Sequence, residues 1–446
     1  MNKKNDGDSC VNGNSNCYTD YLLYSDKSIQ TFCKRHSLHS DADMDDILKN
    51  VMWACDKFSD NVSRIKNKQI NVYVHDVGDP DAFASAKALG ELFLMHGAND
   101  YRVLCSKIGH PQNVEMIQFC NVVIFPPDHA FENGINCLVD VCPPLGKRNT
   151  QGVLKPPKDI YLVCDHHDDK ESIIEACKSE GIKSVFIPII GKRVGSASTL
   201  IVLMALHFKK LEDLVPETRA ALLLGIYTDT SGMVHNVTPL DSAMFNLLNN
   251  GKAAEIFSAL QFYEYPDDWL DLKHRAYVNQ VKVGKIRLTT TGLTPDYCRD
   301  VIAECANDII RQKDTAMSYC LAITHNGLEL SIRANSRLLK LEPDRIIHIV
   351  EQMFNELFPG KSGFKFSKMF PHNVYGGACV KLEPIDMTWL EIRDSKPDYK
   401  RKDIQDKCLN RCKEYIFAIV KVMQNMASVD HELMAGLDLE NNKDSI

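Results

Sequence analysis

Several features are absent from this chain, and each absence excludes a class of protein. No run of 18 apolar residues occurs among the 446 residues, so we expect no segment that spans a membrane. The first stretch, MNKKNDGDSCVNGNSNC, has two lysines but no apolar segment, so we expect no signal peptide. Basic residues are not in excess, since 52 Lys and Arg stand against 59 Asp and Glu. This balance excludes a uniformly basic surface for nucleic acid but leaves room for a local basic groove.

Closely spaced cysteine pairs are also absent. The 16 cysteines include no Cys-x-x-Cys motif, and a zinc finger normally needs two such tight Cys or His pairs. The closest pair, Cys408 and Cys412, has the i,i+4 spacing of a helix. We therefore expect reduced, mostly buried thiols in a cytoplasmic protein.

The composition is that of an ordinary globular chain, long enough for two or three domains of about 150 residues each. Residues 1–66 are predicted to form a flexible, polar tail followed by an amphipathic helix at 41–58. The apolar residues of that helix recur at three- and four-residue spacing, and they could dock on the main domain or on a partner.

Residues 67–255 alternate between short apolar runs and helical stretches. This alternation predicts an α/β domain with a mainly parallel, doubly wound sheet. The expected strands are Ile70–Val74, Arg102–Cys105, Val122–Phe125, Cys137–Val141, Ile160–Cys164 and Val185–Ile189. The expected helices are Ala82–Met95, Val114–Phe119, Ser196–Lys209, Pro216–Tyr227 and one that begins after Pro239.

The pattern changes after this domain. A helix near 266–282 is expected within a helical linker, 256–283, and a smaller α+β domain is expected at 284–385. Its expected strands are Lys285–Thr290, Met317–Thr324, Leu328–Arg333 and Ala378–Leu382, with helices at 295–312 and 343–357. Residues 386–446 are predicted to form a helical extension with a long amphipathic helix at 399–426. The two terminal helices are candidates for forming a homodimer.

Polar residues follow the predicted strands of the first domain. The four segments are His75–Ala82, Asp140, Asp165–Asp169 and, at a helix end, Thr228–Gly232. A single Asp at a strand end is often only a helix cap, and a His pair in a loop is usually solvated. In an open α/β sheet, however, ligands bind at the carboxyl ends of the strands, and four such segments favour a shared site.

The residue types of these segments suit metal chemistry. Two imidazoles and four carboxylates can hold two divalent ions about 3.5–4 Å apart, and one carboxylate must then bridge them, for which Asp140 is suited. Thiolate-free, carboxylate-rich ligation favours Mn²⁺ or Mg²⁺, with Mn²⁺ better matched once imidazole takes part. Two such ions would bring the pKa of a shared water towards neutrality and neutralise phosphoryl oxygens.

The order of motifs HxxxDxDA, VD, DHH and TDT, over residues 70–250, resembles the DHH phosphoesterase superfamily. The resemblance implies one metal held by His75, Asp79 and Asp140. It implies a second metal held by Asp81, Asp140, His166 and Asp229. It further implies that His167 faces the scissile phosphate as a hydrogen-bond donor or general acid, with Asp165 orienting the histidine.

Two further stretches resemble parts of that superfamily. Gly195–Leu200 is similar to its Gly-Ser-Thr stretch, where Ser196 and Ser198 could receive a phosphate at a helix N-terminus or could simply cap the helix. Residues 284–385 resemble the DHH-associated domain of the oligoribonuclease, 3′-phosphoadenosine-5′-phosphate phosphatase and cyclic-dinucleotide phosphodiesterase branch. The substrate-binding residues that this implies are Arg333 in Ser-Ile-Arg, and His372, Gly376 and Gly377 in a glycine-rich loop. Phe370-Pro371 replace the Gly-Gly that usually precedes the loop histidine.

The resemblance implies a Mn²⁺-dependent phosphodiesterase with two ions per chain, although Mg²⁺ is an alternative. Its expected substrate is a short oligonucleotide, held in a cleft between the domains and hydrolysed to nucleoside 5′-monophosphates. Alternatives are a cyclic-dinucleotide phosphodiesterase or 3′-phosphoadenosine-5′-phosphate phosphatase, and then an inorganic pyrophosphatase or exopolyphosphatase. A catalytically dead nucleotide-binding scaffold would lack a ligand, whereas all six ligand positions are filled.

Overall fold

The computed structural model describes residues 42–142, 159–167, 170–179, 182, 184–191, 194–234, 236–324, 327–360, 362–369, 373–380 and 402–438. The predicted N-terminal tail and the start of the C-terminal extension therefore lie outside the described residues. The chain forms two compact units. The first comprises the residues up to Ile108 and Gln112–Tyr263, and the second comprises Gly109–Pro111 and the residues from Glu264 onward.

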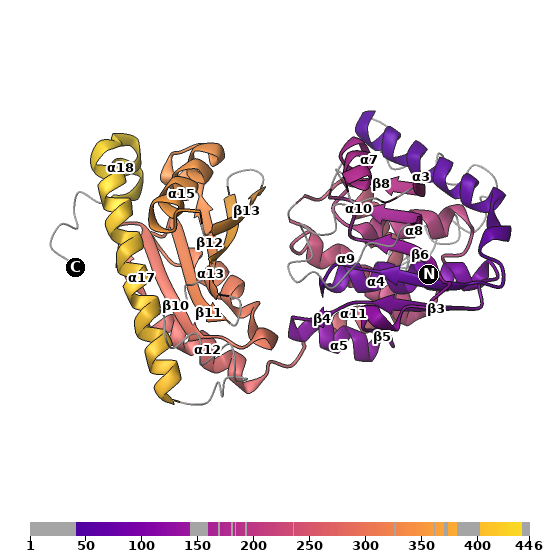
Figure 1. The fold of residues 1–446 in the computed structure, drawn as a ribbon, viewed down its shortest axis with the longest axis horizontal. Coiled ribbons are helices and arrows are strands. Elements are labelled where there is room, and N and C mark those ends of the chain that lie inside the picture. The colour runs from indigo at the N-terminus through magenta and orange to yellow at the C-terminus, as the bar shows by residue number, and fades with distance from the viewer. Residues whose placement is uncertain are drawn as a thin grey trace, which may run out of the picture. The chain divides into compact units, whose positions relative to one another are not determined.

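The first unit is built on a six-stranded sheet whose order is β5-β3-β1-β6-β7-β8 (Figure 1). All neighbouring strands in it are parallel, so the predicted parallel α/β fold is confirmed. The strands are β1 (Gln69–Tyr73), β3 (Asp100–Leu104), β5 (Ile124–Phe125), β6 (Ile135–Val139), β7 (Asp159–Asp165) and β8 (Ser184–Ile190). A separate parallel pair joins β2 (Val77–Gly78) to β4 (Lys107–Ile108).

Both faces of this sheet are buried, as a parallel sheet requires. Ile70 and Val72 of β1 belong to the large apolar cluster on one face, whereas Tyr73 belongs to a smaller cluster on the other. The helices are α3 (Ala42–Asp60), α4 (Pro80–Met95), α5 (Pro111–Phe119), α7 (Lys170–Ser179), α8 (Ala197–His207), α9 (Pro216–Asp229), α10 (Pro239–Leu248) and α11 (Gly251–Ala259). Two short 3₁₀ helices are η2 (Val62–Arg64) and η3 (Pro127–His129).

Helix α3 is the amphipathic helix predicted near the N-terminus. Its residues Ile47, Val51 and Phe58 are buried in the large cluster of the first unit, and the helix packs on β8 and α8. Of the two docking alternatives that the sequence left open, the apolar face of α3 therefore packs on the main domain.

The second unit contains a mixed sheet of order β13-β14-β12-β11-β10-β9. Only β10 and β11 pair in parallel, and the other neighbours are antiparallel, in agreement with the predicted separate α+β domain. The strands are β9 (Val281–Val283), β10 (Ile286–Leu293), β11 (Met317–Thr324), β12 (Gly327–Asn335), β13 (Ser362–Met369) and β14 (Asn373–Val380). The helices are α12 (Asp267–Val278), η4 (Asp296–Cys298), α13 (Val301–Ile310), α14 (Ser336–Leu339), α15 (Pro343–Leu357), α17 (Lys402–Val429) and α18 (His431–Leu437).

Two helices extend the second unit beyond the predicted limits of its domain. Trp269 and Leu272 of α12 are buried against Cys305 of α13, so this helix belongs to the second unit although it precedes residue 284. The long helix α17 lies along the sheet and buries Cys412 and Ile416 in the other apolar cluster of the unit (Figure 1). The sequence showed these helices, but not the surfaces that they cover.

The remaining expectations about the chain can be compared with the described residues. The 12 cysteines whose side chains the structure describes are all buried thiols outside any disulfide, as predicted. Within the part of the chain that the structure describes, no helix has both the length and the apolar character needed to cross a bilayer.

Candidate metal centre

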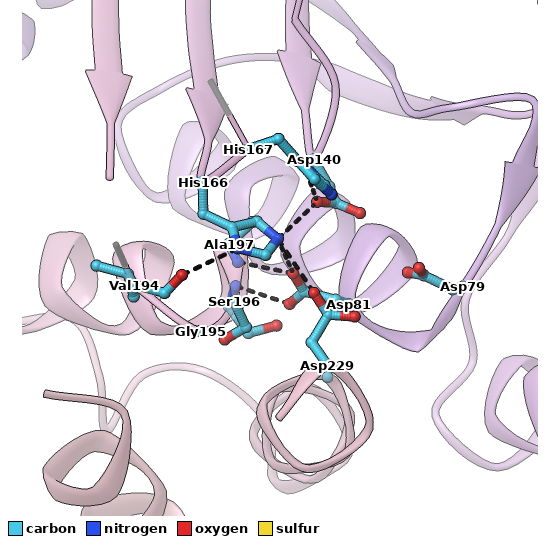
Figure 2. A network of polar contacts seen from close by, with 12 residues as sticks. Asp79, Asp81, Asp140, His166, His167, Val194, Gly195, Ser196, Ala197 and Asp229 are labelled. Carbon is cyan, nitrogen blue, oxygen red and sulfur yellow. Dashed lines mark hydrogen bonds and ion pairs between the residues drawn. The ribbon is translucent and has the colours of Figure 1, made fainter. Parts of the chain in front are cut away.

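The four polar segments meet because three of them follow adjacent parallel strands. In the sheet, β1 lies beside β6 and β6 beside β7, so their carboxyl ends share one edge. His75 follows β1, Asp140 follows β6, and β7 ends at Asp165, directly before His166. Asp229 is the last residue of α9 and reaches the same point (Figure 2). The structure thus brings together the segments that the sequence singled out.

The first of two overlapping groups consists of His75, Asp79 and Asp140. Nε2 of His75 lies 3.4 Å from Oδ2 of Asp79 and 3.3 Å from Oδ2 of Asp140. Asp79 is positioned as the N-cap of α4, where its Oδ1 accepts a hydrogen bond from the backbone N–H of Ala82 at 2.9 Å. Its other oxygen remains directed at the histidine.

The second group consists of Asp81, Asp140, His166 and Asp229. Nε2 of His166 lies 3.1 Å from Oδ2 of Asp229 and 3.3 Å from Oδ1 of Asp140. The same nitrogen lies 3.8 Å from Oδ2 of Asp81. Asp140 therefore offers one oxygen to each group, which is the arrangement that a bridging carboxylate requires.

The backbone of Asp140 adopts an unusual conformation that directs this side chain. Its φ angle is 55°, in the left-handed region that Asp and Asn enter more readily than other non-glycine residues. Its N–H still donates to the carbonyl of Cys164 at 2.9 Å, so the strand pairing continues while the chain turns. Non-glycine residues in this region occur preferentially at functional sites.

The hydrogen bonding of His166 fixes which of its ring nitrogens faces the carboxylates. Nδ1 lies 3.0 Å from the carbonyl oxygen of Val194, and a carbonyl can only accept, so Nδ1 carries the proton (Figure 2). In the neutral ring, Nε2 then carries a lone pair, and carboxylate oxygens surround it. Neither Nε2 of His166 nor Oδ1 of Asp140 has a hydrogen-bond partner, although both atoms are buried. Divalent cations would satisfy both atoms, so the donor set fits a metal centre.

Asp81 is held in place by the N-terminus of α8. One of its oxygens accepts a hydrogen bond from the backbone N–H of Ala197 at 2.7 Å (Figure 2). The other accepts from the backbone N–H of Ser198 at 2.8 Å. The positive end of the helix dipole therefore faces this fully buried carboxylate. Gly225 of α9 permits the close packing, because a Cβ there would lie 3.0 Å from Cα of Asp81 and 2.4 Å from Oγ of Ser198.

This arrangement corrects the prediction that Ser196 and Ser198 bind a phosphate of the substrate. Both serines are fully buried. The hydroxyl of Ser196 caps α8 by accepting from the N–H of Thr199, and that of Ser198 bonds with the hydroxyl of Ser85 at 3.1 Å. The helix N-terminus receives a carboxylate of the protein, and of the two serines only Ser196 caps the helix.

The electrostatics of the cluster also favour cations. Burial, together with the charges of Asp229 and Asp140, raises the pKa of Asp81 well above its usual value. Burial raises the pKa of Asp229 to about 6, although His166 opposes the shift. Burial alone would lower the pKa of His166, but Asp140 and Asp229 outweigh it and raise that pKa. In the absence of metal, the cluster therefore retains protons that divalent cations would displace.

His167 forms a separate pair with Asp165. Nδ1 of His167 lies 2.8 Å from Oδ1 of Asp165, which is fully buried, and this bond helps keep the pKa of Asp165 below its usual value against the effect of burial. Because Nδ1 donates to the carboxylate, Nε2 is the nitrogen left for other contacts. Nδ1 also lies 3.5 Å from Oδ1 of Asp140, so the geometry alone would also allow a group of His167, His166 and Asp140.

In the second unit, Arg333 of β12 is only 8% exposed. Its Nε donates to Oδ1 of Asn307 at 2.6 Å, and its guanidinium lies 4.3 Å from the ring centre of Tyr375. Its Nη1 donates to Oγ of Ser331 at 2.8 Å and to the carbonyl of Ile332 at 2.9 Å. Burial lowers the pKa of Arg333 to about 10, so it stays charged at neutral pH. Among the described residues, no carboxylate forms an ion pair with it.

The predicted glycine-rich loop is different in the structure. Gly376 and Gly377 lie inside strand β14, where Ile332 and Ser331 of β12 are their partners, because β14 begins at Asn373 and not at Ala378. β13 pairs with the other edge of β14, so the two glycines lie in a strand that has a neighbour on each side. His372 lies outside the described residues.

The amino-acid sequence is distantly similar to that of a known protein. No family model matches the chain. An uncharacterized protein of Methanocaldococcus jannaschii is 22% identical over 287 residues, which cover 64% of this chain and 55% of that protein. The chain therefore spans about half the length of this curated relative.

Solved structures are similar over most of the chain. The crystal structure of an exopolyphosphatase-related protein from Bacteroides fragilis has a TM-score of 0.52 at 16% identity, covering 76% of this chain and 95% of that one. RecJ from Thermus thermophilus, in complex with Mn²⁺, has a TM-score of only 0.32 at 12% identity, covering 77% of this chain and 54% of that one. The chain thus shares the fold of this exopolyphosphatase-related protein, while its membership of the DHH phosphoesterase superfamily and the branch within it stay predictions.

Proposed function

We propose that this protein is a metal-dependent phosphodiesterase that hydrolyses short oligonucleotides to nucleoside 5′-monophosphates. The observation that carries the proposal is the buried carboxylate of Asp140, which offers one oxygen to the group of His75 and the other to the group of His166. When bound, two divalent ions lower the pKa of a water molecule and neutralise the oxygens of a phosphoryl group.

The residues of the candidate site would have separate roles in holding the metal ions and in acting on the phosphate. His75 and Asp79 would hold one ion, and Asp81, His166 and Asp229 the other, with Asp140 shared. His167 would donate a hydrogen bond from Nε2 to the scissile phosphate or protonate the leaving oxygen, because its Nδ1 is engaged by Asp165. The thiolate-free donor set, with two imidazoles, makes Mn²⁺ the preferred ion and Mg²⁺ the alternative.

The proposed substrate class depends on the second unit. Arg333 is a buried cation with no carboxylate partner among the described residues, and a buried charge of this kind is stabilised by an anion. We propose that it binds a phosphate or sugar remote from the reacting phosphorus. A net-acidic chain without a uniformly basic surface favours short substrates over long strands.

A second candidate is hydrolysis of polyphosphate, which the name of the similar Bacteroides fragilis protein suggests. A substrate panel separates the candidates. Metal-free protein supplied with Mn²⁺ is assayed on dinucleotides, longer RNA, cyclic dinucleotides, 3′-phosphoadenosine-5′-phosphate, pyrophosphate and polyphosphate. The highest kcat/KM is expected on a dinucleotide, with nucleoside 5′-monophosphate as product. Turnover of polyphosphate alone would establish the second candidate, and no turnover would contradict both.

Arg333→Ala should lower kcat/KM on a dinucleotide by about 2–3 kcal/mol, the value of one charge-assisted contact. Binding energy from remote parts of a substrate positions its reacting end, so kcat should fall as well as affinity. A small activated phosphodiester, which does not reach Arg333, should be hydrolysed almost as fast as by the wild type. Steady-state kinetics on both substrates measure the difference.

Arg345→Ala is the matched control for this prediction. Arg345 belongs to the same unit but lies on α15, which packs on the other face of the sheet, and it pairs with Asp430 at 2.6 Å. Its removal should leave both substrates unaffected. Equal losses on both substrates with Arg333→Ala would mean that Arg333 supports the fold, and the proposed substrate contact would be wrong.

A further inference from the structure

A buried carboxylate lies outside all four polar segments of the sequence. Asp241 belongs to the first turn of α10 and is fully buried. Its Oδ2 accepts hydrogen bonds from the N–H of Gly195 at 2.9 Å and from the N–H and hydroxyl of Thr238 at 2.9 and 2.6 Å. Its Oδ1 accepts from the hydroxyl of Thr199 at 2.6 Å. Both oxygens are therefore engaged by the chain.

A capping role for α10 explains only half of these contacts. Thr238 and Asp241 form a reciprocal capping box at the start of that helix. The bonds to Gly195 and Thr199 are different, because they reach a segment more than forty residues earlier in the chain. They connect α10 to the turn that precedes α8 and to the first turn of α8.

The segment that Asp241 holds is the one that orients two of the proposed metal ligands. The carbonyl of Val194 accepts the proton of Nδ1 of His166. The N–H groups of Ala197 and Ser198 donate to Asp81. Gly195, which donates to Asp241, lies between these two anchor points. A shift of the turn would therefore move His166 and Asp81 together.

Close packing leaves this turn little freedom to move. A Cβ on Gly195 would lie 2.6 Å from Cγ2 of Thr230 and 2.9 Å from Oδ2 of Asp241. Thr230 directly follows Asp229, a third ligand of the same group. The turn is thus confined between the end of α9 and the carboxylate of Asp241, which accepts the hydrogen bond from the N–H of Gly195.

We infer that Asp241 is a positioning residue for one half of the metal centre, the half that contains Asp81 and His166. It touches no proposed metal ligand and acts through the turn at Val194–Ala197. The other half, His75 and Asp79, makes no hydrogen bond to this turn among the described residues. This inference rests on the metal centre of the proposed function, and it predicts an asymmetric defect.

Manganese titration of metal-free protein, with free Mn²⁺ followed by electron paramagnetic resonance, tests the inference without any assay of hydrolysis. In Asp241→Ala, one of the two ions should bind about 10- to 100-fold more weakly, the usual effect of losing a residue that orients metal ligands, while the other ion binds as in the wild type. Thr238→Ala is the matched control, because it breaks the capping box of α10 but keeps the bond from Gly195. It should lower the melting temperature and leave both affinities unchanged.

Two further variants keep the test decisive. Asp241→Asn should retain both affinities, because its amide oxygen can accept from Gly195 and Thr238 while its amide nitrogen donates to the hydroxyl of Thr199. If Asp241→Ala fails to fold, Thr199→Val removes one of the two bonds to the segment and should weaken one ion several-fold. Wild-type affinities for both ions in folded Asp241→Ala, or in Thr199→Val where Asp241→Ala does not fold, would overturn the inference and leave the proposed function standing. Absence of Mn²⁺ binding in the wild type would overturn the proposed function, and the inference with it.

Discussion

Asp140→Asn is expected to abolish hydrolysis while the protein remains folded. A neutral amide cannot share one negative oxygen with each of two cations, so both halves of the centre weaken at once. The fold should survive because Asn has the same shape and tolerates the left-handed backbone that Asp140 adopts, with φ of 55°. Alanine at this position would add backbone strain and confuse the result. Steady-state kinetics and circular dichroism measure the two effects.

Asp314→Asn provides the control for this substitution. Asp314 is also in the left-handed region, with φ of 56°, but it is exposed and belongs to the second unit. The same chemical change should have no effect on turnover there. If Asp140→Asn kept more than about a tenth of the wild-type kcat, a loss below about 1.4 kcal/mol in activation free energy, the assignment of Asp140 as the shared ligand would be wrong.

His167→Ala is expected to reduce turnover by about 10²- to 10⁴-fold while two ions remain bound. Nδ1 of His167 is engaged by Asp165 at 2.8 Å, and we propose that the remaining nitrogen, Nε2, acts on the phosphate and not on a metal. Metal analysis of the purified variant, alongside kcat, separates these roles. Loss of one ion would show instead that His167 is a ligand in the group with Asp140 and His166.

A second substitution isolates the nitrogen that matters. His167→Asn places an amide near the position of Nδ1 and can keep the bond to Asp165, but it has nothing at the position of Nε2. It should be as slow as His167→Ala. His207→Ala is the matched control, because His207 pairs with Asp56 at 3.1 Å at the far end of α8 and should be replaceable without loss of turnover. Near-normal rates for His167→Asn would assign the histidine to supporting Asp165.

The sequence predicted well which residues meet at the candidate site, because each of them follows a recognisable local pattern. A buried strand that is followed by His75 or Asp140 can be seen in the amino-acid order, and the carboxyl ends of neighbouring parallel strands lie at the same edge. What the order could not give is which strands are neighbours. β1 and β6 are separated in the chain by β3 and β5, yet they lie side by side in the sheet.

Residues that act through tertiary packing were missed or misassigned for the same reason. Ser196 and Ser198 could equally face a ligand or the protein, and only the approach of Asp81 to the start of α8 decides between these. Asp241 resembled an ordinary residue in the first turn of a helix. Its bond to Gly195 spans 46 positions and leaves no local trace. The glycines of β14 were likewise assigned to a loop, because strand pairing with β12 cannot be read from a Gly-Gly pair.

Counting the metal ions of the wild-type protein tests the central claim most directly. Metal-free protein is titrated with Mn²⁺ at equilibrium, and hydrolysis of a dinucleotide is measured at each concentration. Two ions per chain are predicted, with hydrolysis that follows the occupancy of the weaker one, because both halves share Asp140. Full hydrolysis with one ion bound, or with none, would contradict the two-metal account.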